Sequence, residues 1–257
     1  MPSALQALCR EIVGCQRCPR LVQYREQVAR QKRRAFRDWE YWGRPVPGFG
    51  DPAARLLVIG LAPAAHGGNR TGRVFTGDRS GDWLFETLHR FGFANQPTST
   101  HRDDGLQLND AYVTAAVRCA PPDNKPTPDE LAQCQTYLAR ELQLLPDVRA
   151  IVALGRFAFD AYFGVRRLRG QPRPQPRPQF AHARAYDLID IRLIGSYHPS
   201  QRNTQTGMLT HAMFDRVFAT ARQFIDTGPA TRRDGSVAAV TRAHHAIGHR
   251  HTASNVK

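Results

Sequence analysis

The stretch RLLVIG, residues 55–60, is a short unbroken apolar run that ends in glycine. Strands that are buried on both faces have this pattern, because neither row of their side chains meets water. Three further apolar runs have a comparable length and character, and each of them predicts another buried strand. These runs are AYVTAAV at 111–117, AIVAL at 150–154 and IRLI at 191–194.

Segments with helical patterns lie before, between and after these runs, so that strands and helices alternate along the chain. This alternation predicts an α/β fold of three layers, α/β/α, with a four-stranded, mostly parallel central sheet. The expected helices span residues 3–36, 82–91, 130–145 and 210–224, with a further short helix after Gly155.

Three loops follow the predicted strands, at residues 61–81, 118–128 and 195–207. Binding sites in parallel α/β folds gather at the carboxyl ends of the strands. We therefore expect these loops to meet at one edge of the sheet and to form the functional site there.

The balance of charge favours a polyanionic partner. The 257 residues include 36 Lys and Arg against 22 Asp and Glu, a formal charge of +14. Nucleic acid fits such an excess best and an anionic membrane surface second, although a soluble enzyme from an arginine-rich proteome would show the same charge. No run of about 18 apolar residues predicts a membrane span. The N-terminus does not have the pattern of a secretory signal, so we expect a cytoplasmic protein. We also expect the protein to be a monomer.

The distribution of hydrophobic and polar residues along the chain predicts the domain organisation. A hydrophobic content of 41% allows one full core, and we expect a single domain over residues 1–227. Residues 228–257 are polar and hold four of the ten histidines, which predicts a disordered, basic, histidine-rich tail.

Four cysteines form two groups, Cys15 with Cys18 and Cys119 with Cys134. Four thiolates can hold zinc or an iron–sulfur cluster, and the spacing does not choose between the two. Buried thiols without a metal are the alternative interpretation. Cys9 stands apart from the two groups, and we interpret it as a packed thiol.

The loops that follow the first and the last strand carry the side chains best suited to chemistry. Phe75 could stack on a base, and Asp78, the only carboxylate of its loop, could orient or activate a water molecule. Asp78 could instead cap the helix that follows it. His198 could donate a hydrogen bond to a developing oxyanion, or it could be structural. The hydroxyl of Ser200 suits a phosphate contact.

Taken together, three motifs resemble the uracil-DNA glycosylase superfamily, most closely its family 5, with family 4 as a relative. They are GLAPAAHGGNRTGRVFTGDRSG at 60–81, VRCAPPDNKPTP at 117–128 with Cys134 after it, and YHPS at 197–200. The resemblance covers roughly residues 8–225. It implies an enzyme that flips a damaged base out of DNA and hydrolyses its N-glycosidic bond.

The resemblance also assigns roles to residues. Phe75 would stack on the flipped base, Asp78 would be the catalytic carboxylate, Asn124 would contact base or water, and His198 would stabilise negative charge on the base. The first motif would supply Gly60, Ala62, Pro63 and Ala64 to the base pocket. Cys15, Cys18, Cys119 and Cys134 would bind a [4Fe–4S] cluster. The expected DNA contacts are Asn69, Arg70, Arg73, Ser200, Gln201, Arg202 and Asn203.

Two departures from family 4 bear on specificity. Leu61 and Ala64 in GLAPA replace the Glu and Gly of its GEAPG motif, and Ala115 replaces an Asn that reads the uracil edge. A less selective pocket follows, which makes hypoxanthine, xanthine and modified pyrimidines plausible substrates beside uracil. No catalytic lysine is evident, which predicts a monofunctional glycosylase. The alternatives are a non-catalytic sensor of damaged bases and a zinc-dependent hydrolase of free nucleotides.

Overall fold

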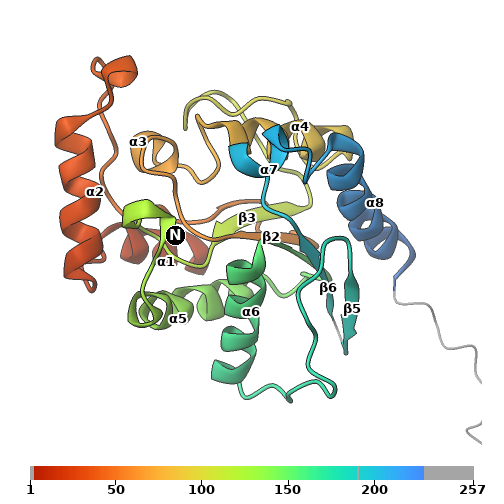
Figure 1. Cartoon of the computed structure of the whole chain (residues 1–257). Coiled ribbons are helices and arrows are strands. Elements are labelled where there is room, and N and C mark those ends of the chain that lie inside the picture. The colour runs from red at the N-terminus through yellow and green to blue at the C-terminus, as the bar shows by residue number, and fades with distance from the viewer. Residues whose placement is uncertain (1–2, 190, 229–257) are drawn as a thin grey trace, which may run out of the picture. The chain divides into compact units, whose positions relative to one another are not determined.

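The four predicted strands form the parallel centre of one sheet (Figure 1). The structure is a computed structural model and describes residues 3–189 and 191–228. The strands lie in the order β1-β3-β2-β4-β6-β5, and the α/β fold is confirmed. The four parallel strands are β3 (Ala111–Ala115), β2 (Leu56–Gly60), β4 (Ala150–Leu154) and β6 (Ile191–Ser196).

The sheet has six strands where the sequence predicted four. At one edge β1 (Phe49–Gly50) pairs antiparallel with β3, and at the other β5 (Ala185–Leu188) pairs antiparallel with β6. Both were missed for a physical reason. Strand β1 is only two residues long and lies in a Gly/Pro-rich loop, while most side chains of β5 are at least partly exposed, so neither produces an apolar run.

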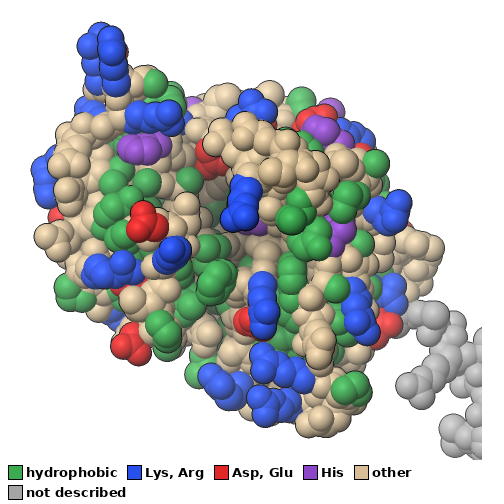
Figure 2. All heavy atoms as spheres, in the orientation of Figure 1, with side chains coloured by type: hydrophobic (Ala, Val, Ile, Leu, Met, Phe, Trp, Pro, Cys, Tyr) green, Lys and Arg blue, Asp and Glu red, His purple; other side chains and the backbone are tan. Residues whose placement is uncertain are grey.

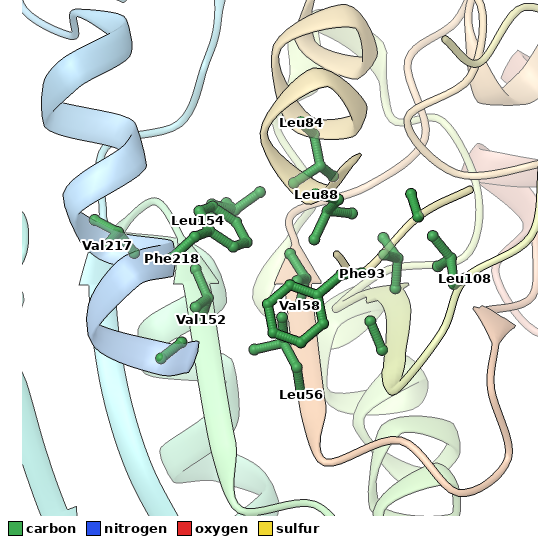
Figure 3. Close-up of a cluster of buried hydrophobic side chains, with 14 of the residues drawn as sticks. Leu56, Val58, Leu84, Leu88, Phe93, Leu108, Val152, Leu154, Val217 and Phe218 are labelled. Carbon is green, nitrogen blue, oxygen red and sulfur yellow. The ribbon is translucent and has the colours of Figure 1, made fainter. Parts of the chain in front are cut away.

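Side chains of β2 alternate between two hydrophobic cores, one on each face of the sheet. Leu56 and Val58 pack beneath α4 (Arg79–Arg90) and α8 (His211–Thr227), as Figure 3 shows. Leu57 and Ile59 point the other way into a second core. The helices that contribute to this second core are α1 (Ala4–Val13), α5 (Pro128–Leu144) and α6 (Arg156–Leu168). The three-layer prediction is therefore confirmed (Figure 1).

The single helix predicted over residues 3–36 is wrong, because the chain breaks at the first cysteine pair. Helix α1 ends at Val13, and α2 (Pro19–Gln31) begins directly after Cys18. Pro19 has no N–H to donate and suits the first position of a helix, so α2 begins there. The short 3-10 helix η1 (Arg34–Phe36) follows it.

Short helices occupy the three loops that follow the central strands. They are α3 (Gly68–Thr71) after β2, the 3-10 helix η2 (Pro122–Asn124) after β3, and α7 (Gln201–Gln205) after β6. Residues up to Asp226 form one compact unit. The predicted tail falls almost entirely on residues 229–257, outside the described residues. Within the described ranges, no helix is long and apolar enough to cross a membrane.

Candidate active site

A cavity of about 750 Å³ lies where the loops after β2, β3 and β6 come together. The prediction that these loops meet at the carboxyl edge of the sheet is thus confirmed. Most of the residues predicted from the sequence for the site lie in the cavity wall. They are Ala62, Ala64, Phe75, Asp78, Asn124, His198, Ser200, Gln201 and Arg202.

Phe75 is held in a strained conformation against the end of β2. Its φ is +53°, and its ring stacks on that of His198 with centroids 5.8 Å apart and an interplanar angle of 27°. A Cβ on Gly60 would lie 2.6 Å from the Phe75 ring, so only glycine permits this close approach. Such strain in a cavity wall is typical of binding and catalytic sites. Gly60 and Pro63 are buried and are not among the residues that line the cavity, so their contact with a base stays a prediction.

The two carboxylate oxygens of Asp78 have different surroundings. Oδ1 caps α4 by accepting hydrogen bonds from the backbone N–H groups of Ser80, at 3.0 Å, and Gly81, at 3.1 Å. Oδ2 lies against Gly67. Burial raises the pKa of Asp78, while the capping bonds and the charge of Arg70 lower it in part. A cavity-lining carboxyl with a raised pKa is suited to positioning a water molecule and taking its proton.

The space beside Asp78 Oδ2 exists because residue 67 is a glycine and has no side chain. A Cβ on Gly67 would lie 2.1 Å from Asp78 Oδ2. Gly67→Ala is therefore expected to displace the carboxylate and to slow base release by about ten- to a hundredfold. Single-turnover assays on a uracil-containing duplex measure this effect. Gly14→Ala is the matched control, since a Cβ there makes only ordinary contacts at 3.8 Å, and equal rates for both variants would contradict the prediction.

His198 is an uncharged histidine at neutral pH. Burial lowers its pKa to about 4, so the imidazole can donate one hydrogen bond without carrying a charge. The loop that holds it is closed by Asn203, whose Nδ2 donates to the His198 carbonyl at 2.8 Å. Ser200 caps the start of α7, because its Oγ accepts a hydrogen bond from the backbone N–H of Asn203 at 3.4 Å. Asn203 thus positions the His198 loop.

Asn124 enters the cavity wall from an unusual backbone turn. It and Asp123 both have a positive φ, at 55° and 53°. Asparagine and aspartate tolerate this left-handed region better than other residues with side chains. The turn leaves the side chain of Asn124 exposed at the cavity, where it can reach a bound base or water.

The prediction that Asn69, Arg70 and Arg73 contact DNA is wrong for all three. Each is buried, with at most 7% of its surface exposed. Arg73 is paired with the Asp104 carboxylate at 2.8 Å, and Asn69 Nδ2 donates to the Arg25 carbonyl at 3.1 Å. Arg70 spans the loop by donating to two carbonyl groups at 2.8 Å each, those of His66 and Gly77. These side chains stabilise the loop that presents Asp78.

One wall of the cavity was missed from the sequence. It comes from the N-terminal region, where Tyr24, Arg33 and Phe36 lie on or after α2, about forty residues before the loop that they face. No local pattern marks them, because only the packing of α2 beside α3 brings them there. His66 of the first motif also lines the cavity, and its Nδ1 is hydrogen-bonded to the Tyr41 hydroxyl at 3.1 Å.

The four cysteines predicted as ligands lie in one neighbourhood. Cys18, Cys119 and Cys134 belong to one small hydrophobic cluster, and Cys15 is close enough to influence the pKa of each of them. Burial raises the pKa of Cys119 to about 11. Cys9 lies elsewhere, with its Sγ 3.9 Å from the Gly48 carbonyl.

Two arginines donate hydrogen bonds to these sulfur atoms. Arg25 Nη1 lies 3.1 Å from Cys119 Sγ, and Arg17 Nε lies 3.5 Å from Cys15 Sγ. Arg25 is buried and also donates to the Cys15 carbonyl at 3.3 Å. Across residues 3–189 and 191–228, no group of three or more His, Cys, Asp or Glu side chains is arranged to hold a metal ion.

Comparisons with known proteins place this site in a family. The model of the uracil DNA glycosylase superfamily matches residues 47–222. The chain is 54% identical over 215 residues to the type-5 uracil-DNA glycosylase of Mycobacterium leprae, a match that covers 83% of this chain and 92% of that protein. It is 52% identical over 219 residues to the type-5 uracil-DNA glycosylase of Thermus thermophilus, covering 85% of this chain and 97% of that protein.

A type-4 uracil-DNA glycosylase, that of Archaeoglobus fulgidus, is more distant. It is 35% identical over 122 residues, which is 47% of this chain and 53% of that protein. The resemblance drawn from the three motifs is therefore confirmed, and the extent of the type-5 matches distinguishes the two types. The chain belongs to the uracil DNA glycosylase superfamily and, within it, to the type-5 family.

Proposed function

We propose that this protein is a DNA glycosylase that flips uracil out of DNA and hydrolyses its N-glycosidic bond. The observation that carries the proposal is the meeting of Phe75, Asp78 and His198 in one cavity, although they come from two loops far apart in the sequence. The type-5 relatives named as uracil-DNA glycosylases support the same substrate. Base excision repair is the process that this activity serves.

In this proposal each of the three side chains has one step. The flipped base stacks on Phe75, at a cost of a few kcal/mol for unpairing and unstacking it. As the bond between the sugar C1′ and the base nitrogen lengthens, negative charge develops on the base, and the neutral His198 donates a hydrogen bond to it. Asp78 Oδ2 holds a water molecule that adds to C1′, and the carboxylate takes the proton that the water loses.

The pocket should accept more bases than uracil. Its volume of about 750 Å³ exceeds what one pyrimidine needs, and small side chains line the wall that follows β2, at Ala62, Ala64 and Ala65. These three alanine side chains carry no hydrogen-bonding group that could select one base edge. Hypoxanthine, xanthine and modified pyrimidines are therefore proposed as further substrates.

No strand cleavage is expected after base removal. The described residues that line the cavity include no lysine, so no amine is placed to form a covalent intermediate with the sugar. The enzyme should be monofunctional and leave an abasic site.

A [4Fe–4S] cluster held by Cys15, Cys18, Cys119 and Cys134 is part of the proposal. Four thiols are the donor set of such clusters, and Arg25 and Arg17 donate hydrogen bonds to two of the sulfur atoms. The resemblance to iron–sulfur uracil-DNA glycosylases, and not the spacing of the thiols, favours the cluster over zinc. When bound, the cluster would cross-link the start of α2, the loop after β3 and α5, and the hydrolysis itself needs no redox step.

Incubation of the pure protein with a uracil-containing duplex, followed by alkali, tests the function. Alkali cleaves the strand at an abasic site, so cleavage only after that treatment is the expected result. A non-catalytic sensor would bind the uracil duplex and release no base. Release of base from free nucleotides alone would favour the nucleotide hydrolase instead.

The rate of base release should change with pH as Asp78 ionises and should not depend on the protonation of His198. His198, with its pKa lowered to about 4, stays neutral from well below pH 6 upward, so the rate should show no step near 6.5, the usual histidine pKa. The pKa of Asp78 is raised, so the rate should rise with pH as this carboxyl ionises. Single-turnover rates measured against pH check both points. A step near pH 6.5 that disappears in His198→Gln would contradict them.

The lowered pKa of His198 also makes the stability of the fold depend on pH. Because folding depresses the pKa of His198, the unfolded chain binds a proton more readily than the folded one between about pH 6.5 and 4. The contribution of His198 to the free energy of unfolding is therefore fully present above pH 6.5 and is lost as the pH falls from 6.5 to about 4.

A further inference from the structure

The basic stretch at the end of α2 is not used by the chemistry described above. We call residues 30–39, which include the end of α2 and η1, the N-terminal arm. Arg33, Arg34 and Arg37 of this arm are exposed. Of these three, Arg37 forms an ion pair with Asp38 at 4.0 Å, and its side chain is 76% exposed. Charges at this distance and exposure interact weakly, so the guanidinium groups are available to a partner.

The arm is fixed beside the cavity by specific contacts. Arg33 and Phe36 line the cavity wall. The guanidinium of Arg70 lies 3.9 Å from the centre of the Phe36 ring and 4.0 Å from that of Trp39, so it is held by both rings. The Arg33 backbone N–H donates to the Tyr41 hydroxyl at 3.3 Å, and that hydroxyl is hydrogen-bonded to His66 in the cavity loop.

Cations also lie on the other sides of the cavity. Arg79 and Arg202 line it and are exposed, and Lys125 follows Asn124. Figure 2 shows basic side chains spread over this face, with one group projecting beyond the rest of the surface over the corner between α2 and η1. A nucleotide that enters the cavity keeps its own phosphates at the rim, and the neighbouring phosphates continue outward from there.

We propose that the N-terminal arm is a second DNA-binding element, which contacts backbone phosphates of the duplex outside the flipped nucleotide. The inference rests on the proposed function for the identity of the polyanion. Exposed arginines on a fixed arm next to the cavity mouth match the charge and the position of a DNA strand that continues past it. Through Arg70, the arm is also joined to the loop that carries Asp78.

The test compares two double variants with the same loss of charge. Arg34→Ala with Arg37→Ala removes two arm cations that do not line the cavity. Arg167→Ala with Arg173→Ala removes two exposed cations from the end of α6 and the segment after it. Binding of the full-length protein to an undamaged duplex of about 20 base pairs, a length that spans several phosphates on each side of one site, is measured by fluorescence anisotropy at several salt concentrations.

The arm variant should bind the duplex about tenfold more weakly. The slope of log affinity against log salt should fall by about two, since each phosphate contact contributes about 0.9. The control variant should match the wild type in affinity and slope. Equal slopes for both variants would overturn the proposal, as would arm-dependent binding to anionic phospholipid vesicles without arm-dependent binding to DNA. Because this assay uses no uracil, its failure is distinguishable from a failure to release base.

Discussion

Asp78→Asn is expected to lower the rate of uracil release by about 10²- to 10⁴-fold, the range typical of losing a general base. Asparagine caps helices as well as aspartate does, so Oδ1 can still receive the N–H groups of Ser80 and Gly81. The carboxylate charge at Oδ2, which would take the proton from water, is what the substitution removes. The variant should therefore fold like the wild type and lack the chemical step.

Single-turnover kinetics and thermal unfolding together separate the two roles of Asp78. Asp82→Asn is the matched control, because Asp82 lies in the first turn of the same helix and does not line the cavity. It removes the same charge and should leave base release within about threefold of the wild type. Near-wild-type activity of Asp78→Asn would contradict the assignment and would leave Asn124 or the loop backbone to hold the water.

Cys119→Ala should have the largest effect on stability. If the four cysteines hold a cluster, one missing ligand should remove the brown colour and the bound iron. Loss of a metal site is among the few single substitutions that cost more than about 4 kcal/mol. For a chain of this size that corresponds to a fall in Tm of roughly 8–16 °C.

Cys9→Ala is the control for this experiment. Cys9 lies against Gly48, away from the other four thiols, so its loss should change neither colour nor iron content. Iron analysis, visible absorption and thermal unfolding are measured on all three proteins. A stable, colourless Cys119→Ala variant with full activity would contradict the structural role of the cluster, and zinc in the wild-type protein would contradict its identity.

Much of the fold follows from patterns that are local in the sequence. A continuous apolar run cannot face water on either side, so the runs at 55–60, 111–117, 150–154 and 191–194 predicted the central strands and the layers around them. The edge strands could not be predicted in this way, since β1 is too short and β5 too exposed to leave a pattern. The break between α1 and α2 does carry a local signal, because Pro19 directly follows the cysteine pair and suits the first position of a helix.

The sequence by itself determined which loops form the site, because loops that follow parallel strands must meet at one edge of the sheet. With the resemblance it also predicted Phe75, Asp78 and His198 as site residues, and the three lie in one cavity. The direction of each polar side chain was decided only by the tertiary structure. An arginine in a glycine-rich loop can face DNA or the protein interior, and Arg73 turns inward because the folded chain brings Asp104 to it. Packing of α2 beside α3 likewise places Arg33 and Phe36 at the cavity, a contact between distant segments that no local pattern encodes.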